Sequence, residues 1–340
     1  MMDTDTLPKW MQRWLYGAAV LVLMMVCIGG LTRLSESGLS IVQWKLVTGT
    51  LPPLSHAAWM QEFHDYQATP EFLKKNFSMN LAEFKQIFWL EYLHRLLGRI
   101  IGLWFVVPTF YVLLRTHATP VIKKRMVLMS ALVCMQGAIG WYMVRSGLVD
   151  VPWVSPYRLA LHLSMAALLW CVVIRTLLVS HSSHKGWGVF AMMWGQLVLG
   201  ALVAGLDAGY TYNSFPLMDG QWMPPHMMML HPWYRNFFEH IPMVQFLHRW
   251  WAFVVLAGVF HQWLRDPHSR SARIVLAVLL VQVILGIATL LSVVHIALAS
   301  VHQIMAFILL AVQLRHIYQP VQTNIPHSNH NNLTAKPHFV

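Results

Sequence analysis

The stretch that decides the fold is residues 86–114, QIFWLEYLHRLLGRIIGLWFVVPTFYVLL. It is long and apolar enough for a membrane-spanning helix, which needs about 20 such residues. Near its start, however, it carries Glu91, His94 and Arg95. Glu91 and His94 are three positions apart, so they share one face of a helix. Ionisable groups inside a span are costly and indicate a functional site, although a satisfied polar pair near a helix end would look the same.

Similar apolar runs recur along the chain. Of its 340 residues, 57% are hydrophobic and only 11% are charged, whereas a soluble domain carries about 25% charged residues. The charges are too few to cover a water-exposed surface, so we predict an integral membrane protein. The net charge of +11 comes from basic residues spread between the apolar runs, as the positive-inside rule describes. That distribution argues against a nucleic-acid partner.

Eight helical spans are predicted, at residues 14–33, 86–114, 121–144, 158–180, 187–206, 242–264, 272–292 and 296–317. The lysines and arginines between spans then favour one side, which places both termini in the cytoplasm. We expect a cytoplasmic N-terminus over 1–13 and a disordered cytoplasmic tail over 318–340. The long, aromatic-rich segment 34–85 predicts a partly helical outer cap. No mitochondrial import sequence is recognisable, which favours a bacterial inner membrane.

The two halves of the chain repeat each other. Gly29-Gly30 and Ser37-Gly38 match Gly200-Ala201 and Ala208-Gly209 at a constant offset of 171 positions (29 to 200, 38 to 209). Later equivalents follow in the same order: His94-Arg95 with His248-Arg249, Gln136 and Gly140 with Gln282 and Gly286, and His162 with His302. This agreement predicts an all-α fold of two pseudo-symmetric four-helix bundles, at 14–180 and 187–317.

Each predicted bundle carries two histidines within its spans, His94 with His162 and His248 with His302. Within a pair they lie at a similar depth, near the outer ends of their helices. Two imidazoles on facing helices are the arrangement for six-coordinate haem iron, with one ligand on each face. A structural metal would need three or four converging ligands.

A small residue follows each histidine by four positions, on the same helix face: Gly98, Ala166, Ala252 and Ala306. Such residues would leave room for a porphyrin plate, although they also permit close approach of helices. Arg95 and Arg249 each follow a histidine directly. They could pair with haem propionates or simply extend to the membrane interface, and the sequence leaves both readings open.

The two bundles differ at one informative position. Glu91 stands three residues before His94, whereas Gln245 stands three residues before His248. Proton-coupled chemistry needs a group that can accept and release protons near the reacting atom. We therefore expect bonds to change in the first bundle and only electrons to move in the second.

Four segments carry a family resemblance: GGLTRLSESGLS at 29–40, WKLVTGTLPPL at 44–54, FKQIF at 84–88 and EYLHR at 91–95. Together with the three later histidines, they resemble the haem A synthase family over about residues 14–317. The resemblance is to its proteobacterial and mitochondrial branch, which lacks the paired loop cysteines of the Gram-positive enzymes.

The resemblance implies an oxidoreductase that oxidises the C8 methyl group of haem O to the formyl group of haem A by two successive hydroxylations. It implies haem b bound by His248 and His302, and haem O as substrate between His94 and His162. Glu91 matches the essential glutamate of the family. Electrons would leave through haem b to an acceptor such as a quinone.

The same resemblance implies partners in haem A biosynthesis. Haem O synthase (protohaem farnesyltransferase) would act before this protein, and assembly of a haem–copper cytochrome oxidase would follow. Membrane lipid surrounds the chain, and a homo-oligomer stays open. The main alternative is a diheme b-type cytochrome for quinone-linked electron transfer, which would not need Glu91. A repeat-built transporter with histidines in a proton path is a second alternative.

Overall fold

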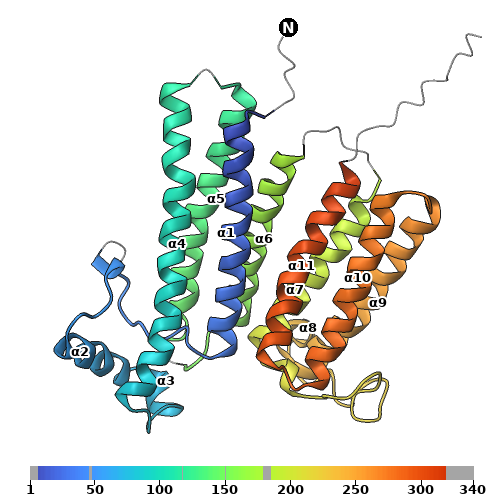
Figure 1. Ribbon diagram of the computed structural model, residues 1–340. Coiled ribbons are helices and arrows are strands. Elements are labelled where there is room, and N and C mark those ends of the chain that lie inside the picture. Colours follow the sequence, from blue (N-terminus) through green and yellow to red (C-terminus); the bar gives the residue numbers. More distant parts are fainter. Residues whose placement is uncertain (1–6, 46–47, 117, 150, 179–184, 319–340) are drawn as a thin grey trace, which may run out of the picture.

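The computed structural model describes residues 7–45, 48–116, 118–149, 151–178 and 185–318. Within these ranges, eight helices are long and apolar enough to cross a membrane, which confirms the predicted all-α membrane fold (Figure 1). They are α1 Lys9–Leu34, α4 Leu81–Arg115, α5 Pro120–Arg145, α6 Pro156–Leu177, α7 Trp187–Gly205, α9 Ile241–Arg265, α10 Arg270–Leu291 and α11 Ile296–Ile317.

Two boundaries differ from the sequence prediction. α1 begins at Lys9 rather than at residue 14, and Met11 is fully buried, so residues 9–13 belong to the helix. At the other end, Tyr318 is packed against the body of the protein. Its ring contacts the Trp187 ring and lies under the Arg175 guanidinium, at 3.9 Å from the ring centroid. The rest of the predicted disordered tail lies outside the described residues.

The first four long helices are here called the first set and the last four the second set. In the first half, α4 and α6 each contact both α1 and α5; in the second half, α9 and α11 each contact both α7 and α10. Because of these contacts, α4 faces α6 diagonally across the first set, and α9 faces α11 across the second. The two sets lie side by side (Figure 1), with α1 against α11 and α6 against α7.

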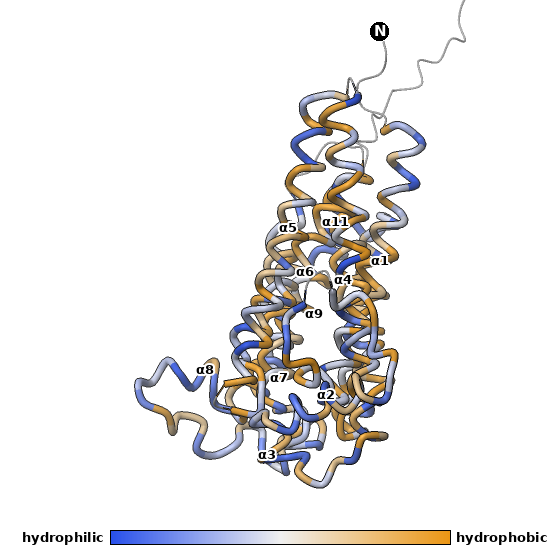
Figure 2. Tube along the Cα trace, turned by 90° about the vertical axis from the view of Figure 1, so that its left-hand side faces the viewer, coloured by the Kyte–Doolittle hydropathy of each residue, from blue (hydrophilic) through white to orange (hydrophobic). Residues whose placement is uncertain are grey.

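The two ends of the molecule differ. The start of α1 and the end of α11 lie at one end of the molecule. α2 and α3 lie at the other end, here called the cap end (Figure 1). Hydrophobic residues follow the lengths of the long helices, whereas hydrophilic ones are frequent in the loops of the cap end (Figure 2). This pattern is typical of helices that cross an apolar layer.

The segment between α1 and α4 forms the predicted partly helical cap. It contains η1 Thr48–Thr50, α2 His56–Gln67 and α3 Pro70–Lys74. Six aromatic residues of α2 and the start of α4 form a buried cluster that joins the two helices: Trp59, Phe63, Tyr66, Phe84, Phe88 and Tyr92. The corresponding segment after α7 has only the short elements η2 Ala208–Tyr210, η3 Trp233–Arg235 and α8 Asn236–Glu239.

The start of α4 is fixed by a capping box. The Asn80 side chain accepts hydrogen bonds from the backbone N–H groups of Ala82 and Glu83, and the Glu83 carboxylate accepts one from the Asn80 N–H. This reciprocal cap satisfies N–H groups that the helix cannot pair internally. α4 therefore begins well before Glu91 and presents Glu91, His94 and Arg95 from a regular helix beneath the cap.

Candidate functional site

The Glu91 carboxylate is buried where the loop after α1 crosses α4. It accepts hydrogen bonds from the Ser40 hydroxyl at 2.7 Å and the Ile41 backbone N–H at 2.8 Å. The Arg95 guanidinium pairs with its other oxygen at 2.7 Å. A buried charge is tolerated only when it is paired and hydrogen-bonded. These contacts satisfy both carboxylate oxygens and fix the side chain in one position.

Arg95 holds the loop as well as Glu91. Its guanidinium donates to the backbone carbonyls of Ile41 at 2.8 Å and Gln43 at 3.1 Å, and it stacks on the Trp44 ring. The sequence left open whether Arg95 contacts a haem propionate or extends to the membrane interface. Neither is needed to explain the position of its side chain. Arg95 is positioned by the chain itself.

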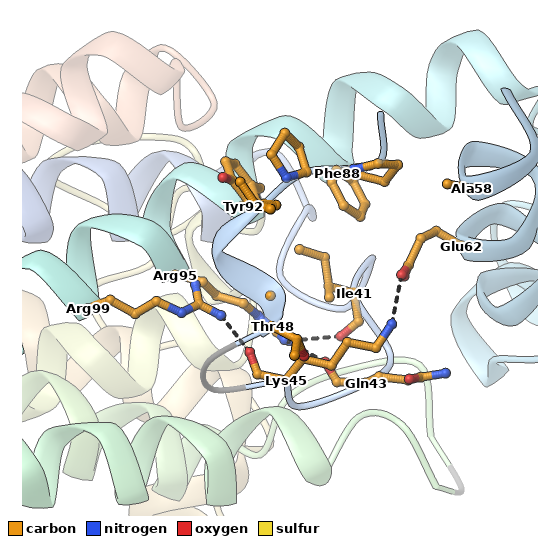
Figure 3. Close-up of a pocket in the computed structure, with 14 residues that line it drawn as sticks. Ile41, Gln43, Lys45, Thr48, Ala58, Glu62, Phe88, Tyr92, Arg95 and Arg99 are labelled. Carbon is orange, nitrogen blue, oxygen red and sulfur yellow. Dashed lines mark hydrogen bonds and ion pairs between the residues drawn. The ribbon is translucent and has the colours of Figure 1, made fainter. Parts of the chain in front are cut away.

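A cavity of about 140 Å³ with a mixed polar and apolar lining opens beside Arg95. Figure 3 shows Arg95 and Arg99 reaching from α4 toward the loop that carries Gln43 and Lys45. Arg99 donates to the Lys45 carbonyl at 2.8 Å, and the Lys45 ammonium pairs with Glu62 of α2 at 3.1 Å. The cavity therefore lies between the cap and the α4 residues nearest Glu91.

The second half builds the same junction with an amide. Gln245 of α9 donates to the backbone carbonyls of Ala208 at 2.9 Å and Thr211 at 2.6 Å. Arg249 donates to the carbonyls of Ser214 at 2.8 Å and of Tyr212. The carbonyls bound by Arg249 and Arg95 are related by the repeat offset of 171 (41 to 212, 43 to 214). The tertiary contacts thus follow the sequence repeat.

The four histidines lie on the diagonally opposed helices of each set. His94 is on α4 and His162 on α6, and the two are close enough to interact electrostatically. His248 on α9 and His302 on α11 form a second such pair. The structure therefore brings together the two pairs that the sequence predicted.

Each histidine ring lies against a glycine of a neighbouring helix, a feature that the sequence prediction missed. A Cβ added at the glycine would lie 3.3 Å or less from a ring atom in every case: 3.3 Å for Gly29 and His94, 3.2 Å for Gly140 and His162, 3.0 Å for Gly200 and His248, and 2.9 Å for Gly286 and His302. Larger side chains would push the rings away. These glycines were visible in the sequence only as markers of the repeat.

The small residues four positions after the histidines do not all leave free space. A Cβ at Gly98 would lie 3.3 Å from the Met25 methyl carbon of α1. At this position α1 approaches the small residue closely, and clearance for a porphyrin plate stays a prediction. Ala166 and Ala306 are partly buried against the hydrophobic core.

The histidine pairs fit a haem better than a structural metal ion. Each imidazole is half-buried, and the buried Nδ1 atoms of His162 and His302 have no hydrogen-bond partner in the chain. Among the described residues, no three His, Cys, Asp or Glu side chains converge to hold an ion. Two imidazoles on opposed helices could hold the iron of a haem.

Comparisons with known proteins agree over most of the chain. The model of the COX15-CtaA family, described as cytochrome oxidase assembly protein, matches residues 12–314. Haem A synthase of Nitrosospira multiformis is 45% identical over 325 residues, which cover 88% of this chain and 90% of the relative. Haem A synthase of Brucella anthropi is 41% identical over 321 residues, covering 89% of this chain and 90% of the relative. This chain belongs to the COX15-CtaA family of cytochrome oxidase assembly proteins.

Proposed function

We propose that this protein is a haem A synthase, an oxidoreductase that converts the C8 methyl group of haem O to the formyl group of haem A. The names of the relatives support this activity. We further propose different roles for the two bundles, which rest on one observation. Glu91 and Gln245 occupy equivalent positions in two otherwise matching junctions.

The two halves would then have different tasks. The bundle at 14–180 would bind haem O between His94 and His162, and the bundle at 187–317 would bind haem b between His248 and His302. Matching helix contacts and matching arginine–carbonyl contacts support the repeat. Haem b, when bound, would act as a one-electron carrier.

Glu91 is suited to hold and move a proton beside the substrate. Oxidation of a methyl group removes protons together with electrons, so a nearby carboxylate can accept them. The Ile41 N–H and the Arg95 guanidinium fix the carboxylate in place, and the Ser40 hydroxyl offers the next hydrogen-bonding group. His94 lies one helical turn further along α4, which keeps Glu91 close to the proposed substrate site.

The arginines and the surroundings complete the proposal. Arg95 and Arg249 hold the loops over the two sites. Their guanidinium groups would also attract haem propionates. According to the positive-inside rule, both termini would lie on the cytoplasmic side of a bacterial inner membrane. Haem O synthase would supply the substrate, and electrons would pass through haem b to an acceptor such as a quinone.

The test is production of haem A in a bacterium that has haem O synthase but no haem A synthase. Extracted pigments should contain haem A when this chain is expressed, and only haem O and haem b when His162→Ala is expressed. If the wild-type chain binds two haems and reduces quinone without forming haem A, it is a diheme b-type cytochrome and the synthase proposal is wrong.

A further inference from the structure

Three of the four glycines that face a histidine ring share a second feature. A glutamine stands four residues earlier on the same helix, one turn away: Gln136 before Gly140, Gln196 before Gly200 and Gln282 before Gly286. On α1 the corresponding residue before Gly29 is Met25. His94 is therefore the one histidine of the four whose glycine has no such glutamine.

Two of these glutamines hold the helical turn that bears the histidine. Gln136 donates through Nε2 to the His162 carbonyl at 3.0 Å, and Gln196 donates to the His248 carbonyl at 3.0 Å. The Gln196 amide also lies 3.2 Å from His248 Nδ1. These bonds restrain the helical turn from which each imidazole projects, and such outer contacts orient a ligand residue.

Met25 occupies the equivalent position beside His94 but cannot donate a hydrogen bond to the turn that carries it. Its methyl carbon packs against Gly98, four residues after His94, where the other three histidines are followed by alanine. A thioether has no hydrogen-bond donor, and the flexible Met side chain adapts its shape to its neighbours. The α4 turn that carries His94 is thus held by apolar packing where α6 and α9 are held by an amide.

We propose that Met25 makes His94 the axial ligand that releases, so that substrate haem enters and product haem leaves from the His94 side. This inference rests on the proposed function, because only a substrate site has to exchange its haem. His162 and His248, whose carbonyls accept a glutamine hydrogen bond, would stay in place, His162 at the substrate haem and His248 at the resident haem b. The exchange of one amide for a thioether thereby separates a turnover site from a permanent one.

The test measures haem release, independently of catalysis. The purified full-length protein carrying haem O or haem A is mixed with excess apomyoglobin, and the transfer of haem is followed by absorbance. Met25→Gln should slow release from the first bundle about fivefold, since one added hydrogen bond contributes about 1 kcal/mol. Met25→Leu is the matched control, which lacks a donor as the wild type does and should release at the wild-type rate.

Gln136→Met provides a second, reciprocal variant should Met25→Gln fail to fold. It removes the donor behind His162 and should speed release from the first bundle about fivefold. Gln196→Met should likewise speed loss of haem b from the second bundle. This result would show that the glutamine acts in the same way in both bundles.

The outcomes separate the inference from the proposed function. Wild-type release rates in folded Met25→Gln or Gln136→Met, with normal haem occupancy, would overturn the role of Met25 and leave the synthase proposal intact. Absence of haem O and haem A from the first bundle of the wild-type protein would instead overturn the proposed function itself.

Discussion

The loop after α1 and the loop after α7 are held by the same device, an arginine that binds two backbone carbonyls of the loop. Arg95 binds those of Ile41 and Gln43, and Arg249 binds those of Tyr212 and Ser214. Even the unusual backbone recurs, since Glu36 and Asp207 have φ values of 52° and 54°, in the left-handed region. The two junctions differ mainly in the residue three positions before the histidine.

That difference shows what the junction requires and what it does not. Gln245 donates to loop carbonyls, whereas Glu91 accepts from the Ser40 hydroxyl and the Ile41 N–H. A neutral amide therefore suffices to fasten the loop, and it avoids the cost of a buried charge. Because the second junction is built without a carboxylate, the comparison supports the proposed role of Glu91 in the chemistry of the first bundle.

The strongest test of this comparison makes the first junction resemble the second. Glu91→Gln should lower haem A formation by about 100-fold or more, since general acid–base groups contribute about 10²–10⁴-fold. The haem O and haem A contents of cells are measured by pigment extraction. Haem binding should persist, because the amide can still fasten the loop. Undiminished haem A in this variant would contradict the assignment of Glu91.

A second test exchanges the histidines rather than the acid. His248→Ala should lower bound haem b at least about tenfold because an axial ligand is lost, whereas His94→Ala should retain haem b and lose conversion. A reduced-minus-oxidised spectrum with pigment analysis of both purified variants distinguishes these results. If both variants lose the same haem, the two bundles do not have separate tasks.

The glycine contacts allow a finer comparison of the two bundles. A methyl group at Gly286 would lie 2.9 Å from the His302 ring, so the ring must shift, while at Gly29 it would lie 3.3 Å from the His94 ring. Gly286→Ala should destabilise the second site by about 1–3 kcal/mol and Gly29→Ala should disturb the first site less.

Retention of haem through detergent washes at rising temperature measures this effect. Gly137→Ala is the control, because nothing lies within 4 Å of a Cβ at that position. Equal haem loss in Gly286→Ala and Gly137→Ala would show that the glycines do not seat the rings.

The smallest effect concerns the cap, which the second half lacks. Burial raises the pKa of the Glu71 carboxyl to about 7, despite the hydrogen bond that it accepts from Tyr66, and the nearby Glu91 and Glu36 raise it further while Lys75 opposes them. The folded cap therefore binds a proton more tightly than the unfolded chain does. Its contribution to stability is present below about pH 4.5 and is lost as the pH rises to about 7.

Limited proteolysis of the cap at pH 6 and pH 8 measures this dependence. Cleavage of the wild type should be a few-fold faster at pH 8, and Glu71→Gln should remove most of the difference. The pH dependence would have another origin if Glu71→Gln kept the full difference.

Several features of this protein could be read from the sequence because they depend on local physics. A span of about 20 apolar residues must form a helix in lipid, where every backbone polar group needs an internal partner. The eight helices could therefore be predicted, and so could the histidines and the Glu91–Gln245 difference, which the internal repeat exposed. The start of α1 at Lys9 was not predicted, because helix ends depend on packing beyond the apolar run.

Only the tertiary structure decided which residues meet across the helices. The seating of His94 on Gly29, the packing of Met25 on Gly98, and the use of Arg95 on loop carbonyls join residues that are far apart in the chain. The burial of Glu71 within the cap also became apparent only in the structure. Such contacts depend on how each helix is rotated and how closely it approaches its neighbour, and packing of the whole fold sets both.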